Sequence, residues 1–418
     1  MLESLHAFQD LPRLRELVVI LIRHGFGDVI RRAGVGTFLE RAGELLSAGR
    51  DDSLTHLELP VRIRMALEAM GPTFVKLGQV LSTRVDLFPP EWIDEFERLQ
   101  HTVAPAPSDA MIAQMTEALG RPPAEVFDGF EPQPFASASI AQVYRARLAD
   151  GSPVVLKVRR PGIRPRIEAD LRILSVLAGV AEREIPELQR FQPMEMIAQF
   201  GKSIARELDL ALEARNQERF ARSFADDPNV VIPRIHWEHT SATMNVQDYV
   251  EGVPGNELEL VERAGLSRKV LADRGAAAVL KMILVDGFFH ADPHPGNVVY
   301  LPGNRIAMLD FGMVGRLSDH RRNQIVDLLA ALSRRDEQAM TAVLLDWTGD
   351  AIVDESKLAQ DLGDLVSEYE HLALKDIHVG RLLSEIATAK RDDAIVLPPD
   401  LALLFKALIS LEGLGRRL

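Results

Sequence analysis

Two short polar segments carry the residue types that bind phosphate groups and divalent metal ions. The first runs from His290 to Asn297, reads His-Ala-Asp-Pro-His-Pro-Gly-Asn, and contains the carboxylate of Asp292. The second, Leu-Asp-Phe-Gly at 309–312, contains the carboxylate of Asp310. Carboxylate and amide oxygens are the ligands that Mg²⁺ takes when it also contacts phosphate oxygens. An aspartate, an asparagine five residues later and then Asp-Phe-Gly is the order of parts in a phosphoryl-transfer site.

A β-hairpin is the element that must bring these two segments together. Residues 297–301 and 305–309 are apolar, and Pro-Gly-Asn separates them, which predicts two antiparallel strands joined by a turn. The hairpin would deliver Asp310 close to Asn297. The two prolines between 290 and 297 exclude a helix there and stiffen the loop.

Two other interpretations of these segments compete with phosphoryl transfer. The residues could form a polar turn around an ordinary hairpin, or His290, Asp292 and His294 could bind a transition metal. The transition-metal interpretation leaves Asn297 and Asp310 without a role.

The composition is that of a globular chain of 418 residues, long enough for two to three domain-sized units. The net charge of −13 argues against binding of nucleic acid through its phosphates. The absence of cysteine excludes disulfides, thiolate metal sites and cysteine nucleophiles. No secretory signal is visible, and no apolar run approaches the roughly 18 residues needed to span a bilayer.

Helices are predicted to dominate the first hundred residues. Leu14, Leu17, Val18 and Leu21 recur at helical spacing between arginines, so this helix could lie on a membrane surface or pack on its own protein.

Residues 60–100 are predicted to form a helical hairpin whose first helix opens at Gly71-Pro72. Lys76 and Gln79 lie off the apolar stripe of that helix. Gly78 costs a helix about 1 kcal/mol, and it indicates close approach of another group.

A mixed α/β part begins near Phe135, with strands predicted at 140–148 and 153–158. Lys157 lies among aliphatic residues of the second strand and needs an anionic partner. The loop Ala136-Ser137-Ala138-Ser139 precedes the first strand and can turn backbone N–H groups toward phosphate. Two further strands are predicted at 230–235 and 243–247, followed by a hinge-like segment at 248–252.

Two helices are predicted between these pairs of strands, one at 164–183 and one that opens at Pro193 and carries Glu207, Asp209 and Glu213. At about 100° per residue, Asp209 and Glu213 share a face of one helix while Glu207 points away from both. Glu207 and Glu213 should therefore serve different partners.

Assembled in this order, the motifs resemble the UbiB/ADCK family of atypical kinase-like proteins from about Pro60 to the C-terminus. The matching segments are Lys76–Gln79, Ala136–Val143, Glu207–Asp209, His290–Asn297 and Asp310–Gly312. The resemblance implies an α+β, two-lobed protein-kinase-like fold with an N-terminal helical extension packed over the active site. The implied domains are the extension at 1–130, a β-rich N-lobe at 131–248 and a helical C-lobe at 249–418.

The resemblance also implies a role for each candidate site residue. Lys157, oriented by Glu213, would hold the phosphates of ATP, Asn297 and Asp310 would hold Mg²⁺, and Asp292 would orient the nucleophile. The nucleotide would contact Ala136, Ser137, Ala138, Ser139, Val143, Lys157, Gln247, Tyr249 and Val250. Lys76 and Gln79 would fold over the site and regulate it, with Lys76 paired to Glu207 or Asp209. Ser137 replaces an alanine common in the family and leaves the preference between ATP and ADP open.

The function implied by the resemblance is an Mg²⁺-dependent ATPase that supports biosynthesis of ubiquinone or another isoprenoid quinone. It would act on lipophilic quinone precursors or other lipids, or extract them, at the cytoplasmic face of the inner membrane. It would be peripheral or anchored by a segment beyond Leu418, would work beside quinone-biosynthesis proteins, and would bind no nucleic acid. A small-molecule or lipid kinase and a nucleotide-binding scaffold without turnover are the alternatives. No Ala-Pro-Glu motif or long loop follows Gly312, which argues against a peptide substrate.

Overall fold

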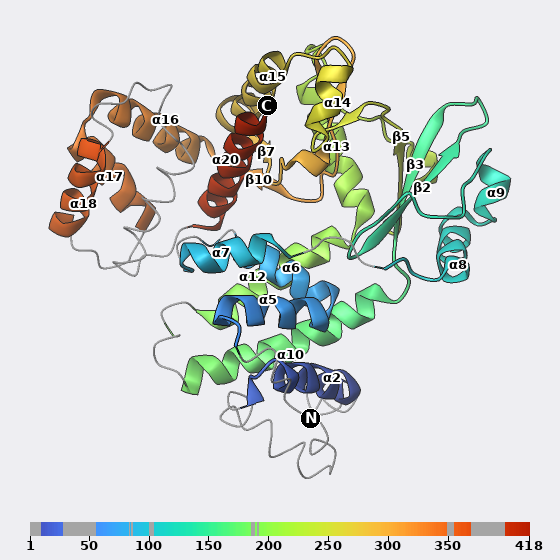
Figure 1. Ribbon diagram of the computed structural model, residues 1–418, viewed down its shortest axis with the longest axis horizontal. Helices are drawn as coiled ribbons and strands as arrows, with labels where there is room; N and C mark the ends of the chain where they lie inside the picture. Colours follow the sequence, from blue (N-terminus) through green and yellow to red (C-terminus); the bar gives the residue numbers. More distant parts are fainter. Residues whose placement is uncertain are drawn as a thin grey trace.

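Helices pack around three small β-sheets in the computed structural model, which describes residues 10–27, 56–82, 84, 87–99, 104–184, 189, 192–348, 355–368 and 398–418. Figure 1 shows one sheet with β2, β3 and β5 on the right and a helical lobe with α15–α18 and α20 opposite. The N-terminal helices α2, α5, α6 and α7 lie below with α10 and α12. The two-lobed α+β arrangement that the sequence predicts is therefore confirmed.

The N-terminal helices share one apolar core. They are α2 (Leu11–Arg23), α5 (Leu59–Met70), α6 (Pro72–Leu81) and α7 (Pro90–Glu97). Leu17 and Val18 of α2 are each 3% exposed, and Leu17 packs in this core with Phe74, Phe96 and Ile173. The sequence left open whether this helix lies on a membrane surface or packs on its own protein. For the face that carries Leu17 and Val18, packing on the protein is confirmed.

Gly78 lets α6 approach α5 and the residue Leu99 just after α7, as its place inside a helix indicates. A Cβ atom on Gly78 would lie 2.1 Å from Leu99 Cδ1 and 3.2 Å from Leu67 Cδ1. Both leucines are buried in the same core, so a larger residue would have to displace them.

The sheet that carries Lys157 has the strand order β1-β2-β3-β5, and every pair is antiparallel. Its strands are β1 (Ala136–Ser137), β2 (Ala141–Arg147), β3 (Pro153–Arg159) and β5 (Met244–Asp248). One face packs on α8 (Ser108–Leu119), α9 (Pro123–Val126) and the segment around them, through a core that includes Tyr144, Leu156 and Val246. Because side chains alternate along a strand, Lys157 lies on the other face.

The helix predicted from Pro193 through Glu213 is two helices, so the single-helix assignment was wrong. α12 (Pro193–Glu207) ends at Glu207, and α13 (Leu210–Ser223) begins after Asp209. The Asp209 side chain accepts hydrogen bonds from the backbone N–H groups of Ala211 and Leu212, at 3.0 and 3.2 Å. Aspartate is a strong N-cap residue, and this cap starts a new helix where apolar periodicity alone predicts continuity. The other predicted helix is α10 (Ile163–Glu184).

The strand predicted at 230–235 is shorter in the structure, which corrects a second assignment. Only β4 (Val230–Val231) is a strand, and it pairs in parallel with β9 (Arg305–Met308). Proline at 233 has no N–H to continue the ladder, and Ile235 makes an isolated bridge to Gln247. β4 thus pairs with the second lobe although it lies within 131–248.

The predicted hairpin is confirmed as β8 (Val298–Leu301) and β9, and β6 (Val253–Pro254) completes the sheet order β4-β9-β8-β6. A two-stranded sheet joins β7 (Phe288–His290) to β10 (Val314–Arg316). The described helices of the second lobe are α14 (Leu258–Arg263), α15 (Arg268–Leu280), α16 (Asp319–Arg334), α17 (Glu337–Thr348), α18 (Glu355–Glu368) and α20 (Pro399–Arg417). Three short helical turns lie at Trp237–His239, Lys281–Val285 and Pro295–Asn297. Among the residues described, no helix combines the length and apolar character needed to cross a bilayer.

A buried carboxylate fastens the N-terminal helices to α10. Asp170 is 0% exposed and accepts hydrogen bonds from Arg13 Nε at 2.6 Å and from Thr73 Oγ1 at 2.5 Å. Arg13 belongs to α2 and Thr73 to α6, so one side chain joins three helices. This contact adds a polar anchor for α6 to its apolar packing.

We expect Asp170→Ala to lower the free energy of unfolding by about 3–5 kcal/mol, because Arg13 and the Thr73 hydroxyl would remain buried without their carboxylate. Urea unfolding followed by circular dichroism measures the change. The matched control is Glu16→Ala. Glu16 also pairs with Arg13, but its own side chain is 49% exposed. The control substitution should cost no more than about 1 kcal/mol. Equal losses in the two variants would contradict a special role for Asp170.

Candidate functional site

A cavity of about 680 Å³ lies between the lobes and collects most of the predicted site residues. Its lining includes Lys76, Gln79, Ala138, Ser139, Lys157, Glu207, Glu213, Asp292, Asn297 and Asp310. These residues come from α6, the loop before β2, β3, α12, α13 and the two polar segments around the hairpin. Seven stretches of the chain therefore meet in one cleft.

Seven of the residues named in advance do not line this cavity: Ala136, Ser137, Val143, Asp209, Gln247, Tyr249 and Val250. Val143 pairs directly with Lys157, and Gln247 pairs with Val155, so both lie on the Lys157 face of the sheet. The Tyr249 hydroxyl accepts a hydrogen bond from Arg145 Nη2 at 3.1 Å. Contact of these residues with a nucleotide stays a prediction.

Lys157 is held between two carboxylates. Its Nζ lies 2.7 Å from Glu213 Oε1 and 3.1 Å from Asp310 Oδ2. The pairing with Glu213 that the resemblance implies is thus present. Burial acts to lower the pKa of Lys157, but the charges of Asp310 and Glu213 outweigh it and raise the pKa above its ordinary value. The lysine therefore stays charged, as a phosphate-binding group must.

The two carboxylates beside Lys157 differ in their pKa values. Burial, only partly offset by Lys157, raises the pKa of Glu213 to about 7, and the charge of Asp310 acts in the same direction. Desolvation acts to raise the pKa of Asp310 too, but Lys157 and Lys76 outweigh it and lower that pKa. Asp310 is thus the fully ionised member of the pair at neutral pH, which suits a metal ligand.

Lys76 forms an ion pair with Glu207, which joins α6 to the end of α12. The resemblance implies Glu207 or Asp209 as the partner of Lys76, and in the structure the partner is Glu207. The Asp209 carboxylate instead caps α13, and its Oδ2 lies 3.8 Å from Arg215 Nη2. Glu207 and Glu213 do have different partners, although they stand on separate helices and not on two faces of one.

His290 stabilises the loop that carries Asp292. Its Nδ1 accepts the N–H of Asp292 at 3.1 Å, so Nε2 carries the ring proton and donates to the Leu309 carbonyl at 3.1 Å. Burial lowers the pKa of His290, which keeps the ring neutral. This side chain therefore ties the first polar segment to the second.

Both nitrogens of His290 are thus occupied, and the interpretation as a transition-metal site is wrong. Among the residues described, no three His, Cys, Asp or Glu side chains lie where they could hold a metal ion together.

Asn297 and Asp310 fit a magnesium ion whose remaining ligands are phosphate oxygens. Asn297 Nδ2 donates to the Asp292 carbonyl at 3.1 Å, which leaves the amide oxygen available as a hard ligand. Asp310 has φ of +56°, an uncommon conformation for a residue other than glycine, and its Oδ1 accepts the N–H of Gly312 at 3.2 Å. This turn holds the carboxylate toward Lys157.

Lys406 of α20 is a cleft residue that the sequence analysis missed. Its Nζ lies 3.2 Å from Asp292 Oδ1. Burial acts to raise the pKa of Asp292, but Lys406 and His294 outweigh it and lower that pKa. Phe405 and Ala407 beside Lys406 are buried. A lysine inside an apolar helix is the same signal that pointed to Lys157, so it could have been recognised.

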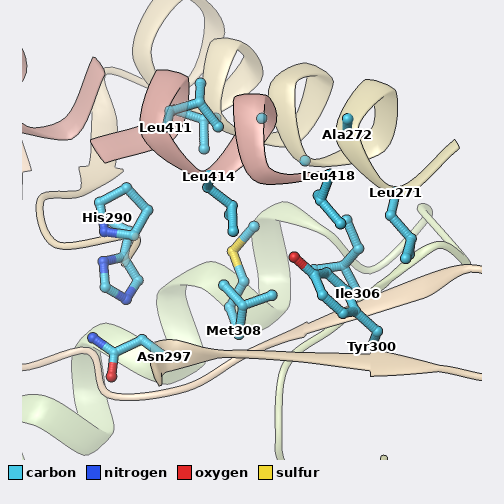
Figure 2. Close-up of a pocket in the computed structure, with 15 residues that line it drawn as sticks. Leu271, Ala272, His290, Asn297, Tyr300, Ile306, Met308, Leu411, Leu414 and Leu418 are labelled. Atoms are coloured by element: carbon cyan, nitrogen blue, oxygen red, sulfur yellow. The ribbon is translucent and has the colours of Figure 1, made fainter. Parts of the chain in front are cut away.

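A second, apolar cavity of about 30 Å³ lies behind the loop of Asn297 (Figure 2). Leu411 and Leu414 of α20 and Leu418 just after it form one wall, and Met308 and Tyr300 of the hairpin lie opposite. The Tyr300 hydroxyl is buried without a hydrogen-bond partner in the part of the chain that the structure describes, and burial raises its pKa to about 12. The volume has room for a water molecule beside this hydroxyl. Asn297 and Leu414 line both cavities.

Two protein-family models match parts of this chain. Residues 98–344 match the ABC1 atypical kinase-like domain, and residues 362–418 match the UbiB helical domain, which includes Lys406.

Three curated relatives carry the name Probable protein kinase UbiB. The protein of Marinobacter nauticus is 37% identical over 364 residues, 85% of this chain and 66% of its own length. Those of Sodalis glossinidius and Aeromonas salmonicida are 33% and 34% identical, each over 98% of this chain and 76% of its own length. The chain therefore spans between 66% and 76% of the length of these relatives.

Among solved structures, Rv3197 of Mycobacterium tuberculosis, in its complex with erythromycin, superimposes with a TM-score of 0.54. It is 23% identical in sequence, and the match covers 74% of this chain and 80% of that chain. Together with the ABC1 match, this likeness supports a kinase-like fold.

We expect Glu213→Gln to change how stability depends on pH. The folded carboxyl of Glu213, with its pKa of about 7, binds a proton more tightly than the unfolded one near 4.5. Between these pH values the folded state holds more protons, so wild-type stability should fall relative to the variant as pH rises, by roughly 3 kcal/mol in all. Denaturant unfolding of both proteins from pH 4 to pH 8 measures this. Parallel pH profiles would show that Glu213 has an ordinary pKa.

Proposed function

The chain belongs to the UbiB family of ABC1 atypical kinase-like proteins, and from that premise we propose that it binds Mg-ATP between its lobes and hydrolyses it. One observation carries the proposal: Lys157 sits between Glu213 and Asp310 in a cavity that Asp292 and Asn297 also line. This set contains a phosphate-binding cation, an orienting glutamate, hard metal ligands and a carboxylate for the nucleophile.

In this proposal each residue has a separate task. Lys157 binds the phosphates, and Glu213 keeps its ammonium in place. Asn297 and Asp310 would hold Mg²⁺, which would neutralise negative charge on the phosphates. Lys406 contacts Oδ1 of Asp292, so Asp292 orients the nucleophile through Oδ2, which lies 3.8 Å from His294 Nε2.

The reaction that these residues would support is an in-line displacement. The oxygen of water bonds to the γ-phosphorus while the bond between this phosphorus and the β–γ bridging oxygen breaks, and ADP leaves with that electron pair. The water proton passes to Asp292 and then to the product phosphate. Because the low pKa of Asp292 makes it a weak base, its main contribution is orientation, which suits a loose transition state.

The enclosure of the cleft favours water or a small hydroxyl compound over a peptide. α6 closes one side through the Lys76–Glu207 ion pair, and α20 closes another through Lys406 and Asp292. After Gly312 the chain forms β10 and then α16 directly, with Ser318 as its N-cap. A protein substrate would therefore lack the platform that an activation loop supplies in ordinary protein kinases.

Family membership supports a biological setting for this turnover. We propose that the protein supports biosynthesis of ubiquinone or another isoprenoid quinone by acting on lipophilic precursors at the cytoplasmic face of the inner membrane. The helical extension at 1–130, the N-lobe at 131–248 and the C-lobe at 249–418 are the proposed domains.

We expect Asp310→Asn to abolish Mg²⁺-dependent phosphate release, because an amide cannot replace the charged metal ligand. Phosphate release from Mg-ATP is measured with and without vesicles of anionic phospholipid and with a phenolic precursor mimic. A second readout is the rise in melting temperature that Mg-ATP gives over ATP with EDTA, which the variant should lose. Asp319→Asn, whose side chain is 89% exposed on α16, is the control and should leave both measurements unchanged.

Other outcomes of the same experiment would replace this proposal. Unchanged turnover in Asp310→Asn would remove Asp310 as a metal ligand. Stabilisation by Mg-ATP without phosphate release, in every lipid condition, would favour a nucleotide-dependent scaffold. Transfer of phosphate to an added alcohol in place of water would favour a small-molecule or lipid kinase.

A further inference from the structure

Helix α20 brings a fixed positive charge to the loop that carries Asp292. Lys406 projects from the middle of this helix, its side chain is 19% exposed, and its Nζ lies 3.2 Å from Asp292 Oδ1. The flanking residues Phe405 and Ala407 are 1% and 0% exposed in the core of the C-lobe. Because the core holds its neighbours, the ammonium has little freedom to leave the cleft.

Two adjacent rows of side chains set the register of α20. Lys406, Ser410, Gly413 and Arg417 recur at spacings of four, three and four, and all line the large cavity. The neighbouring row of Leu411, Leu414 and Leu418 lines the small apolar cavity (Figure 2). The apolar row thus anchors the helix against α15 and the hairpin, and the polar row faces the site.

Lys157 and Lys406 lie at different ends of the cleft. Lys157 contacts Asp310, one of the two proposed metal ligands, where the phosphate chain of a nucleotide would enter. Lys406 contacts Asp292, which would orient the nucleophile. In an in-line displacement the γ-phosphorus lies next to the nucleophile, so a cation on Asp292 is placed at the terminal phosphate.

We propose that Lys406 binds the terminal phosphate of Mg-ATP and thereby makes the attachment of α20 depend on whether ATP or ADP occupies the cleft. With ATP bound, the ammonium bridges Asp292 and a γ-phosphate oxygen. With ADP bound, only the contact with Asp292 remains, and α20 is held less firmly at its centre. The inference rests on the proposed function, because it requires a nucleotide in this cleft.

The test compares Lys406→Met, which keeps the length of the side chain without its charge, with Lys406→Arg, which keeps the charge. Calorimetry gives the dissociation constants of Mg-ADP and of a non-hydrolysable Mg-ATP analogue. Lys406→Met should lose about 10-fold or more of the preference for the ATP analogue, the range expected for one hydrogen bond to a charged group. Its ADP affinity should be unchanged, and Lys406→Arg should keep most of the preference.

The matched control is Arg416→Ala. Arg416 lies on the same helix, where it pairs with Glu412 at the surface, and its replacement should leave both dissociation constants as they are. Lys406→Gln serves as a second uncharged variant if Lys406→Met does not fold.

Hydrogen exchange supplies an independent readout of the attachment of α20. Amides around 405–414 should be more protected with the ATP analogue than with ADP, and this difference should disappear in Lys406→Met.

The possible outcomes separate this inference from the proposed function. A folded Lys406→Met protein with the wild-type ratio of ATP-analogue to ADP affinity would overturn the role of Lys406 and leave turnover untouched. A wild-type protein that binds Mg-ATP without releasing phosphate would overturn turnover, while the affinity ratio would still decide the role of Lys406. A wild-type protein that binds neither nucleotide would overturn both.

Discussion

The balance of charge inside the cleft is the constraint on which the rest of the structure depends. Glu207, Glu213, Asp292 and Asp310 line one cavity, and carboxylates this close together cannot all stay ionised without nearby cations. The cations come from three different parts of the chain: Lys76 from α6, Lys157 from β3 and Lys406 from α20. The site is therefore balanced only when the N-terminal helices, the sheet and the C-terminal helix are all in place. The division of pKa values between Glu213 and Asp310 follows from where the lysines stand.

Structural contacts far from the cleft place these cations. Asp170 joins α2, α6 and α10, and Gly78 allows α6 to approach α5 and Leu99, so the position of Lys76 is set by a packed core outside the site. The leucine row of α20 does the same for Lys406. The polar contacts in the cleft thus depend on the apolar contacts behind it, because neither lysine could reach its carboxylate if its helix were not packed in place.

The sequence predicts local chemistry well here and long-range placement less well. The hairpin at 297–309, the need of Lys157 for an anion and the close approach at Gly78 follow from neighbouring residues, and all three are present. The break at Asp209 was missed because an N-cap aspartate can equally be read as a polar residue on a continuous helix. The strand at 230–235 was predicted too long because its apolar residues continue past Val231, and a two-residue strand carries no pattern that specifies its neighbour in a sheet. Lys406 was missed because its carboxylate partner lies far away in the chain, although its apolar surroundings marked it.

The order in which the three lysines occur has a consequence for biosynthesis of the protein itself. A ribosome makes Lys76 first, Lys157 next and Lys406 after both, and domains fold broadly in that order during synthesis. A nascent chain that has completed the strands through β10 still holds Asp292 without its lysine, beside an apolar hairpin surface that α20 has not yet covered. Arrival of α20 neutralises the carboxylate and buries that surface in the same event. Assembly of the cleft therefore waits until α20 has been synthesised.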